Sequence, residues 1–280
     1  MLTDGQVIRF VEDGFVRVEQ VFTAETAAEC RAILWRDTGC DPADPATWTR
    51  PVIRVGGHAE EPFLIAANGP RLTEAFERLV GPGPWAPRGG IGTFPIRFPS
   101  TEPPGDDGWH LDASFQGDAD PGDYGQYRVN LASKGRALLM LFLFSATDEN
   151  DAPTRIRIGS HLEVARLLEP YGQEGLTMME ISALAATATE HCPIALATGR
   201  PGDVYLCHPF LVHAAQPHRG TQPRFLAQPG LDPVEPYDVD RGTSPVEQAI
   251  RRGVRVGSRA GQYGRTPGTP VRPSGSRVAM

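Results

Sequence analysis

The middle of the chain consists of short apolar segments, each bounded by residues that favour turns. From about residue 90 these segments read GIGTFPIRFP, ALLMLFLFS, PTRIRIG, VYLCH, FLVHAA and RFLAQP, with glycine, proline and aspartate between them. Many short strands with frequent turns are typical of β-sandwiches and β-barrels. Residues 137–144 are apolar without alternation, which indicates a strand covered on both faces. The sequence therefore predicts a mainly β fold.

Helical periodicity lies mostly ahead of this region. Apolar residues recur at helical spacing within 3–14, 24–37 and 71–80, and Thr3 stands where an N-cap is expected. A further helix, over residues 160–172, is expected to interrupt the strands. We expect the N-terminal helices to pack outside the sheets.

The two ends of the chain differ in what they can bury. Residues 1–250 have the length and composition of one domain. Residues 251–280 contain seven arginines, no acidic residue, and much glycine, proline and serine, so they can bury little. We therefore predict a single domain followed by a disordered tail.

Charge and composition exclude several classes of partner. A net charge of -7 argues against a nucleic-acid-binding surface. The four cysteines are scattered and form no CxxC pair, so we expect reduced, interior thiols. No apolar stretch is long enough to span a bilayer, and the first residues lack a signal-peptide pattern. We expect a cytoplasmic protein without a membrane partner. Its composition is typical of GC-rich bacterial coding sequences.

The segment GWHLDASF places His110 and Asp112 two residues apart. On a strand, residues i and i+2 point to the same face, so an imidazole and a carboxylate can converge on one metal ion. The motif alone is also compatible with a hydrogen-bonded surface pair, because one such pair arises readily by chance.

A third ligand is available about a hundred residues later, in PGDVYLCHPFLVHAAQPHRGTQPRF. The candidates are His208, His213 and His218. We favour His213, because the apolar strand FLV precedes it, whereas His208 is followed by a proline. Two imidazoles and one carboxylate form the facial triad of non-haem Fe(II) oxygenases, which leaves three positions open.

The segments GWHLD, ATDENDAPTRIRIGSH and PGDVYLCHPFLVHAA, with an arginine eleven residues after His213, resemble the phytanoyl-CoA dioxygenase family. The resemblance includes the opening LTDGQVIRFVEDGFVRVEQVF and so covers residues 2–230. It implies a double-stranded β-helix (jelly-roll, cupin-like) core. It also implies Fe(II) as the metal, 2-oxoglutarate and O2 as cosubstrates, and His110, Asp112 and His213 as catalytic iron ligands.

The same resemblance implies that Arg224 holds the distal carboxylate of 2-oxoglutarate. A guanidinium donates two parallel hydrogen bonds to a carboxylate and stays charged when buried. Arg219 is the competing candidate, in a turn-like PHRG segment where a solvated arginine is expected.

The chain departs from the family at positions that usually carry serine, asparagine and serine, which here are Ala215, His218 and Gly220. Thr154 is our candidate for a substitute hydroxyl that binds 2-oxoglutarate. In IGSH we expect Ser160 to cap a helix and His161 to be structural.

The presence of Asp112 favours hydroxylation, or another two-electron oxidation, over halogenation. Related halogenases replace this carboxylate with a small residue so that chloride can bind the iron. The expected substrate is a small organic molecule. Candidate substrate contacts are Arg97, Trp109, Phe115 and Arg128, although arginines at strand ends usually face water or pair with carboxylates. Residues 116–126 form a candidate lid, and Asn130 is explained equally well as a turn cap.

Two other functions remain open from the sequence. One is a cupin-type metalloenzyme that uses the same ligands with Zn or Mn and does not need 2-oxoglutarate. The other is a catalytically silent small-molecule-binding protein on the same scaffold. The sequence does not predict the oligomeric state.

Overall fold

The structure is a computed structural model that describes residues 2–83 and 85–262. It has a mixed α/β architecture, with 32% helix and 19% strand, and all of its described strand pairs are antiparallel. The expectation of a mainly β fold is therefore corrected. Many of the strands are only two to four residues long, and three helices that the sequence analysis missed raise the helical share.

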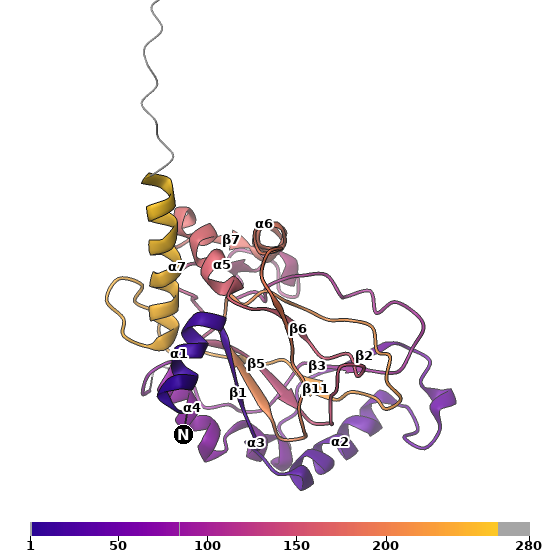
Figure 1. The fold of residues 1–280 in the computed structure, drawn as a ribbon. Coiled ribbons are helices and arrows are strands. Elements are labelled where there is room, and N and C mark those ends of the chain that lie inside the picture. Colours follow the sequence, from indigo (N-terminus) through magenta and orange to yellow (C-terminus); the bar gives the residue numbers. More distant parts are fainter. Residues whose placement is uncertain (1, 84, 263–280) are drawn as a thin grey trace, which may run out of the picture.

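The largest sheet has five strands, in the order β1-β9-β5-β11, with β12 also paired to β5. Its strands are β1 (Phe15–Val18), β5 (Leu138–Leu143), β9 (Val204–Cys207), β11 (Leu226–Ala227) and β12 (Gly230–Leu231). Figure 1 shows this sheet in the middle of the molecule, with segments from both halves of the chain side by side.

Strand β5 is buried on both faces, as its unbroken apolar run predicts. Leu138, Met140 and Phe142 belong to the large core that includes the helices. The alternate residues Leu139, Leu141 and Leu143 belong to a smaller core that they share with Ile156 of the second sheet. Period-2 alternation thus divides one strand between two cores.

The second sheet has three strands, in the order β10-β6-β8, and two further strand pairs complete the structure. The sheet contains β10 (His213–Ala214), β6 (Arg155–Arg157) and β8 (Ile194–Leu196). The pairs are β2 (Val52–Val55) with β3 (Phe94–Arg97), and β4 (Arg128–Val129) with β7 (Leu176–Thr177). The smaller core lies between the two sheets, so they face each other.

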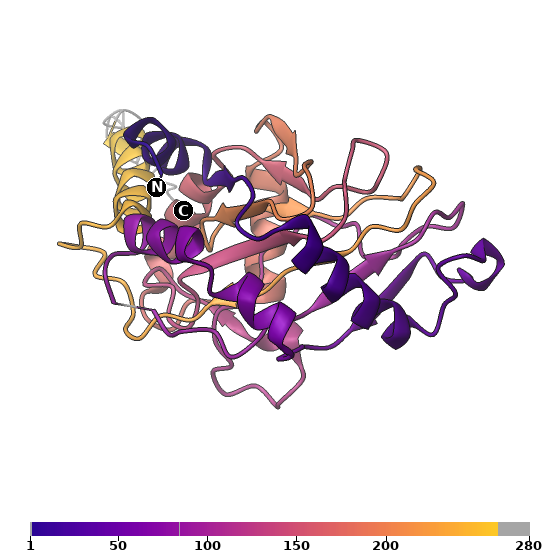
Figure 2. The same cartoon turned by 90° about the horizontal axis from the view of Figure 1, so that it is seen from below.

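The N-terminal helices lie outside the large sheet, as expected (Figure 2). They are α1 (Asp4–Asp13), α2 (Ala24–Thr38), α3 (Glu61–Ala67) and α4 (Pro70–Leu79). Thr3 closes a capping box with Gln6 at the start of α1. The ring of Phe63 in α3 packs edge-on against Phe94 of β3, which fixes this helix on the β2–β3 pair.

The later helices are α5 (Ser160–Leu168), α6 (Met178–Ala188) and α7 (Pro245–Gln262), and three short 3-10 turns cover Pro45–Thr47, Tyr124–Gln126 and Glu169–Tyr171. The expected capping role of Ser160 is corrected. Gly159 is the N-cap of α5, with φ of 78°, and the hydroxyl of Ser160 instead accepts a hydrogen bond from the Val212 amide at 2.9 Å.

Helix α7 continues to Gln262 and so includes residues 251–262 of the segment for which we predicted disorder. The rest of that segment, residues 263–280, lies outside the described part of the chain, so its predicted disorder stays a prediction. Ser244 and Glu247 form a capping box at the start of α7, while Val246 and Ile250 are fully buried. None of the described helices combines the length and apolar character that a membrane-spanning helix requires.

Candidate metal and 2-oxoglutarate site

His110 and His213 lie opposite each other in an antiparallel bridge. The amide of each donates a hydrogen bond to the carbonyl of the other, both at 3.0 Å. Residues directly opposite in such a pair present their side chains on the same face. The imidazole centroids are accordingly 4.4 Å apart. Backbone pairing therefore brings together two histidines that are distant in sequence.

The two imidazoles are held in the same way. Nδ1 of His110 donates to the carbonyl of Gly108 at 2.8 Å, and Nδ1 of His213 donates to the carbonyl of Leu211 at 3.1 Å. With the proton on Nδ1, Nε2 carries a lone pair that can bind a metal. Nε2 of His213 is buried and has no hydrogen-bond partner.

Burial, and next the neighbouring His110, lower the pKa of His213 to about 4. The imidazole is therefore neutral at neutral pH, which is the form that binds metals.

Asp112 completes a cluster that fits a metal ion. Its Oδ1 is 3.9 Å from Nε2 of His213, and the candidate ligand atoms of His110, Asp112 and His213 all lie within 4.8 Å of one another. In the part of the chain that the structure describes, this is the one cluster of three His, Cys, Asp or Glu side chains with metal-binding geometry. Two imidazoles and a carboxylate suit Fe(II).

Arg136 is a neighbour of this cluster that the sequence analysis missed. Its Nη1 is 3.5 Å from Oδ2 of Asp112, and its Nε donates to the carbonyl of Ala113 at 2.9 Å. Burial raises the pKa of the Asp112 carboxyl, but Arg136 and both imidazoles lower it more, so the net pKa lies below its ordinary value. The carboxylate is therefore ionised and ready to bind a cation.

The cluster opens into a cavity of about 340 Å³. Its walls also include three further residues that the sequence analysis singled out as candidates for binding 2-oxoglutarate or substrate, namely Arg97, Thr154 and Arg224. The remaining lining residues are Arg54, Thr93, Pro95, Asp106, Ala215 and Gln228. Spacing gave no signal for Arg54, which reaches the cavity through the pairing of β2 with β3, or for Asp106, which lies in irregular chain ahead of His110.

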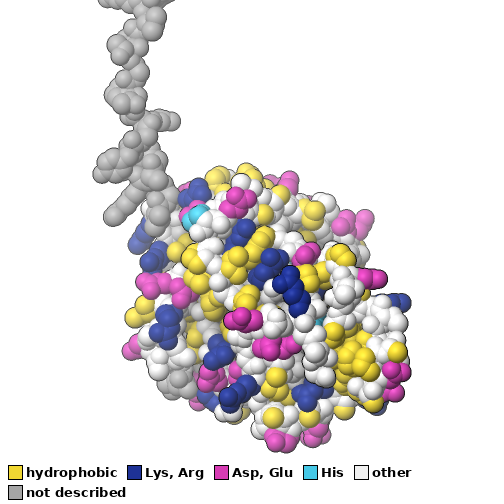
Figure 3. Space-filling view, turned by 45° about the vertical axis from the view of Figure 1, so that its right-hand side comes forward, with side chains coloured by type: hydrophobic (Ala, Val, Ile, Leu, Met, Phe, Trp, Pro, Cys, Tyr) yellow, Lys and Arg dark blue, Asp and Glu magenta, His cyan; other side chains and the backbone are white. Residues whose placement is uncertain are grey.

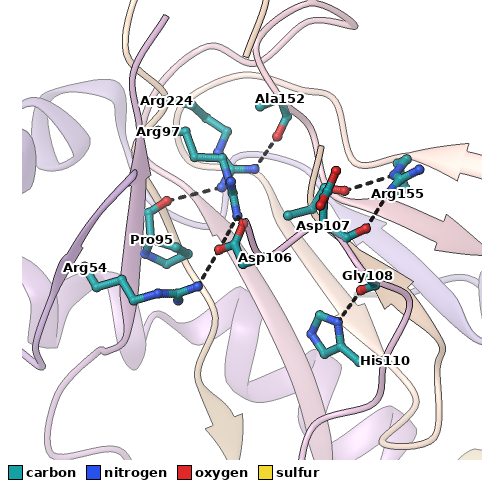
Figure 4. Close-up of polar contacts among 11 residues, drawn as sticks. Arg54, Pro95, Arg97, Asp106, Asp107, Gly108, His110, Ala152, Arg155 and Arg224 are labelled. Atoms are coloured by element: carbon teal, nitrogen blue, oxygen red, sulfur yellow. Dashed lines mark hydrogen bonds and ion pairs between the residues drawn. The ribbon is translucent and has the colours of Figure 1, made fainter. Parts of the chain in front are cut away.

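Arg224 is 2% exposed and lies opposite Arg97 of β3 in a second antiparallel bridge. Its guanidinium donates to the carbonyl of Ala152 and, at 3.3 Å, to that of Pro95 (Figure 4). Burial, and next the charge of Arg97, depress the pKa of Arg224 well below its ordinary value. By contrast, Arg219 is exposed, as expected of a solvated turn residue.

Thr154 is 2% exposed and lines the cavity beside Ala215. Its carbonyl accepts a hydrogen bond from the Ala197 amide at 2.9 Å, which holds the backbone in place. Thr154 and Arg224 therefore line the same cavity.

The other histidines considered in the sequence analysis lie outside this site. His208 accepts from the Phe210 amide at 3.2 Å and packs against His161, whose Nε2 donates to the carbonyl of Val11 at 3.2 Å. His218 is buried and accepts from the Gly220 amide at 3.1 Å. None of these histidines belongs to the metal-binding cluster or lines its cavity.

The four candidate substrate contacts occupy different places. Arg97 lines the cavity, where its Nη2 donates to both oxygens of Asp106 at 2.8 Å. Trp109 does not line it, and its ring is instead covered by Arg155 and Arg157, with guanidinium carbons 4.8 and 4.3 Å from the ring centroid.

Phe115 and Arg128 line a separate cavity of about 560 Å³, together with part of the loop 116–126. Arg128 donates hydrogen bonds to Glu174, from Nη2 to the carboxylate at 3.1 Å and from Nε to the backbone carbonyl at 2.8 Å. Asn130 bonds to the amide of Lys134 at 3.0 Å, as a turn cap does.

Two imidazoles and one carboxylate are the metal ligands of the non-haem Fe(II) oxygenases. Here they lie beside a cavity with a buried arginine, an arrangement that suits the 2-oxoglutarate-dependent members of that class. Residues 10–226 match the phytanoyl-CoA dioxygenase (PhyH) family. This match covers well over half of the chain, so the chain belongs to that family. No curated protein matches the chain.

Solved structures share the fold. HygX from Streptomyces hygroscopicus, with nickel and 2-oxoglutarate bound, is 19% identical over 83% of this chain and 88% of that chain, with a TM-score of 0.52. The carbocyclase SnoK from nogalamycin biosynthesis is 18% identical over 98% and 94%, with a TM-score of 0.55. EctD from S. alaskensis, with 2-oxoglutarate and 5-hydroxyectoine, is 20% identical over 88% and 79%, with a TM-score of 0.50. These neighbours imply a double-stranded β-helix core.

Proposed function

We propose that this protein is an Fe(II)- and 2-oxoglutarate-dependent dioxygenase that oxidises an unactivated C–H bond of a small organic molecule. One observation carries the proposal. The metal-binding atoms of His110, Asp112 and His213 converge in a cavity that also contains the buried guanidinium of Arg224. A metal site alone is compatible with many reactions, but a buried cation beside it provides a place for a dicarboxylate.

In this proposal His110, Asp112 and His213 hold the iron, and Arg224 and Thr154 bind the far end of 2-oxoglutarate. When bound, the iron and 2-oxoglutarate supply the activation of O2 for C–H oxidation, with release of succinate and CO2. Three ligand positions stay open for 2-oxoglutarate and O2 in a facial triad.

The protein's own residues orient the metal ligands and shield the bound carboxylate from water. The carbonyls of Gly108 and Leu211 fix the imidazoles of His110 and His213 so that each presents Nε2. Arg224 is almost fully buried, so a carboxylate that pairs with it is largely removed from water, where charge-assisted hydrogen bonds are stronger.

Hydroxylation is the favoured outcome because Asp112 occupies the ligand position that a halide would need. Its geometry supports this role, since it lies with both histidines in one cluster. Two of the structural neighbours support a small-molecule substrate. One structure of HygX has hygromycin B bound, and SnoK is a carbocyclase from nogalamycin biosynthesis.

Formation of succinate from 2-oxoglutarate tests this function even before the substrate is identified. The protein, loaded with Fe(II) and exposed to O2, is expected to form succinate, faster with an oxidisable compound from a small-molecule panel, whose product gains one oxygen atom. Asp112→Ala is expected to lose both activities. Turnover with Zn or Mn that needs no 2-oxoglutarate would instead establish the cupin-type alternative. A folded protein without metal affinity would establish the silent binding protein.

A further inference from the structure

Two buried guanidinium groups face the same end of the cavity. Arg97 and Arg224 are paired backbone to backbone, with the Arg97 amide donating to the Arg224 carbonyl at 3.1 Å and the reverse bond at 2.8 Å. Side chains directly opposite in an antiparallel pair lie on the same face, and like charges at such positions repel. Figure 4 shows the two guanidinium groups next to each other, with Asp106 beside them.

The charges around this pair do not balance within the protein. Arg97 and Arg224 are 3% and 2% exposed, so water does not screen them well. On the molecular surface shown in Figure 3, by contrast, basic side chains are interspersed with acidic ones. In the cavity, three arginines (Arg54, Arg97 and Arg224) face two carboxylates, Asp106 and the candidate metal ligand Asp112.

Hydrogen-bond donors on both arginines are also unused. Nε and Nη1 of Arg97 and Nε of Arg224 are buried without a partner. Asp106 engages only Nη2 of Arg97. Buried donors on a charged group are costly when they stay unpaired, so these atoms indicate a missing anionic acceptor.

We propose that Arg97 and Arg224 together bind the distal carboxylate of 2-oxoglutarate, as a two-arginine clamp. This rests on the function proposed above and assigns Arg97 to the cosubstrate rather than to the oxidised substrate. A carboxylate has two oxygens and about four acceptor positions, so it can serve both guanidinium groups. It also supplies the negative charge that this opposed pair lacks. Asp106 then positions Arg97 by holding its Nη2.

The test compares 2-oxoglutarate with 2-oxopentanoate, in which a methyl group replaces the distal carboxylate. Dissociation constants are measured by calorimetry on Ni(II)-loaded protein, which binds 2-oxo acids without turnover. The wild-type protein is expected to bind 2-oxoglutarate much more tightly. In Arg97→Met the dissociation constant of 2-oxoglutarate is expected to rise about 10- to 100-fold, the range for loss of a charged hydrogen bond, with that of 2-oxopentanoate nearly unchanged.

Arg219→Gln is the matched control. Arg219 is exposed, follows His218 and does not line the cavity. The variant therefore removes one positive charge without touching the clamp, and the preference for 2-oxoglutarate is expected to persist. Arg97→Lys keeps the charge but cannot donate two parallel hydrogen bonds from one planar group, so its dissociation constant for 2-oxoglutarate is expected to lie between those of wild type and Arg97→Met. This variant replaces Arg97→Met in the test if Arg97→Met does not fold.

The outcomes separate the two proposals. If Arg97→Met and Arg97→Lys leave the preference for 2-oxoglutarate at the wild-type value, or weaken both acids equally, the clamp is wrong while the dioxygenase proposal stands. If the Ni(II)-loaded wild-type protein binds neither acid, the proposed function itself fails.

Discussion

Arg136 and Asp112 face each other at the edge of the candidate metal site, with Nη1 of the arginine 3.5 Å from Oδ2 of the carboxylate. The arginine is held in place, because its Nε donates to the carbonyl of Ala113 and Gly230 lies close to its guanidinium. This contact keeps Asp112 ionised and leaves Oδ1 toward His213.

Replacement of Arg136 is therefore expected to make metal binding more sensitive to acid. In Arg136→Gln the lost cation no longer offsets the effect of burial, so the pKa of Asp112 rises and protons compete with the metal at higher pH. Calorimetric titration with Mn(II) between pH 5 and 7.5 measures this directly. Affinity should fall off at a higher pH than in wild type, and an identical pH profile would show that Arg136 does not act on Asp112.

His161 is expected to make the fold sensitive to acid for a separate reason. Burial, the main cause, lowers the pKa of His161 to about 4 in the folded protein. The unfolded chain takes up the proton near pH 6.5, so stability is complete above that pH and is lost as pH falls toward 4. The loss amounts to about 3 kcal/mol for this one group.

Urea unfolding across this pH range checks the effect. His161→Gln, which can still donate to the carbonyl of Val11, is expected to reduce the pH dependence, whereas the exposed His191→Gln is the control. A pH dependence that is unchanged in His161→Gln would exclude His161 as its source.

Two helical glycines are expected to respond in opposite directions to alanine. At Gly253 in α7 an added methyl would overlap the carbonyl of Leu162 and Cβ of Ala165 in α5, so Gly253→Ala should destabilise the protein by about 1–3 kcal/mol. At Gly5 in α1 nothing lies within 4 Å, and Gly5→Ala should stabilise it by up to about 1 kcal/mol. Equal effects in denaturant titrations would mean that α7 does not pack closely on α5.

Trp109 is expected to matter for stability and not for binding of 2-oxoglutarate. Its ring lies against Arg155 and Arg157 and outside the cavity lining, so Trp109→Leu should cost about 1–2 kcal/mol of unfolding free energy. The dissociation constant of 2-oxoglutarate on metal-loaded protein should stay within about twofold of wild type, a shift of less than 0.5 kcal/mol. A much weaker affinity in a folded variant would place Trp109 in the binding site after all.

The sequence predicts the centre of the site better than its surroundings. His110 and Asp112 follow from the two-residue period of a strand, and His213 from the apolar strand before it, because these signals are local. Arg54 and Arg136 reach the site only through tertiary contacts, and Asp106 lies in irregular chain ahead of His110, so no local pattern reports these three residues.

At two places a local signal points away from the interpretation that we favoured. The alternation that directs His110 toward the cavity directs Trp109 to the opposite face. Ser244 and Glu247 form a capping box ahead of Val246 and Ile250, which predicts a helix where the many arginines suggested disorder.

The central claim is that His110, Asp112 and His213 hold an iron ion to which 2-oxoglutarate binds. Anaerobic titration of the protein with Fe(II) and 2-oxoglutarate tests it most directly, through the visible charge-transfer band of the chelated 2-oxo acid. We expect the band in wild type, its loss in a folded His213→Ala variant, and a much larger 2-oxoglutarate requirement in Arg224→Ala. A folded wild-type protein that gives no band, or a band that persists in His213→Ala, would contradict the account.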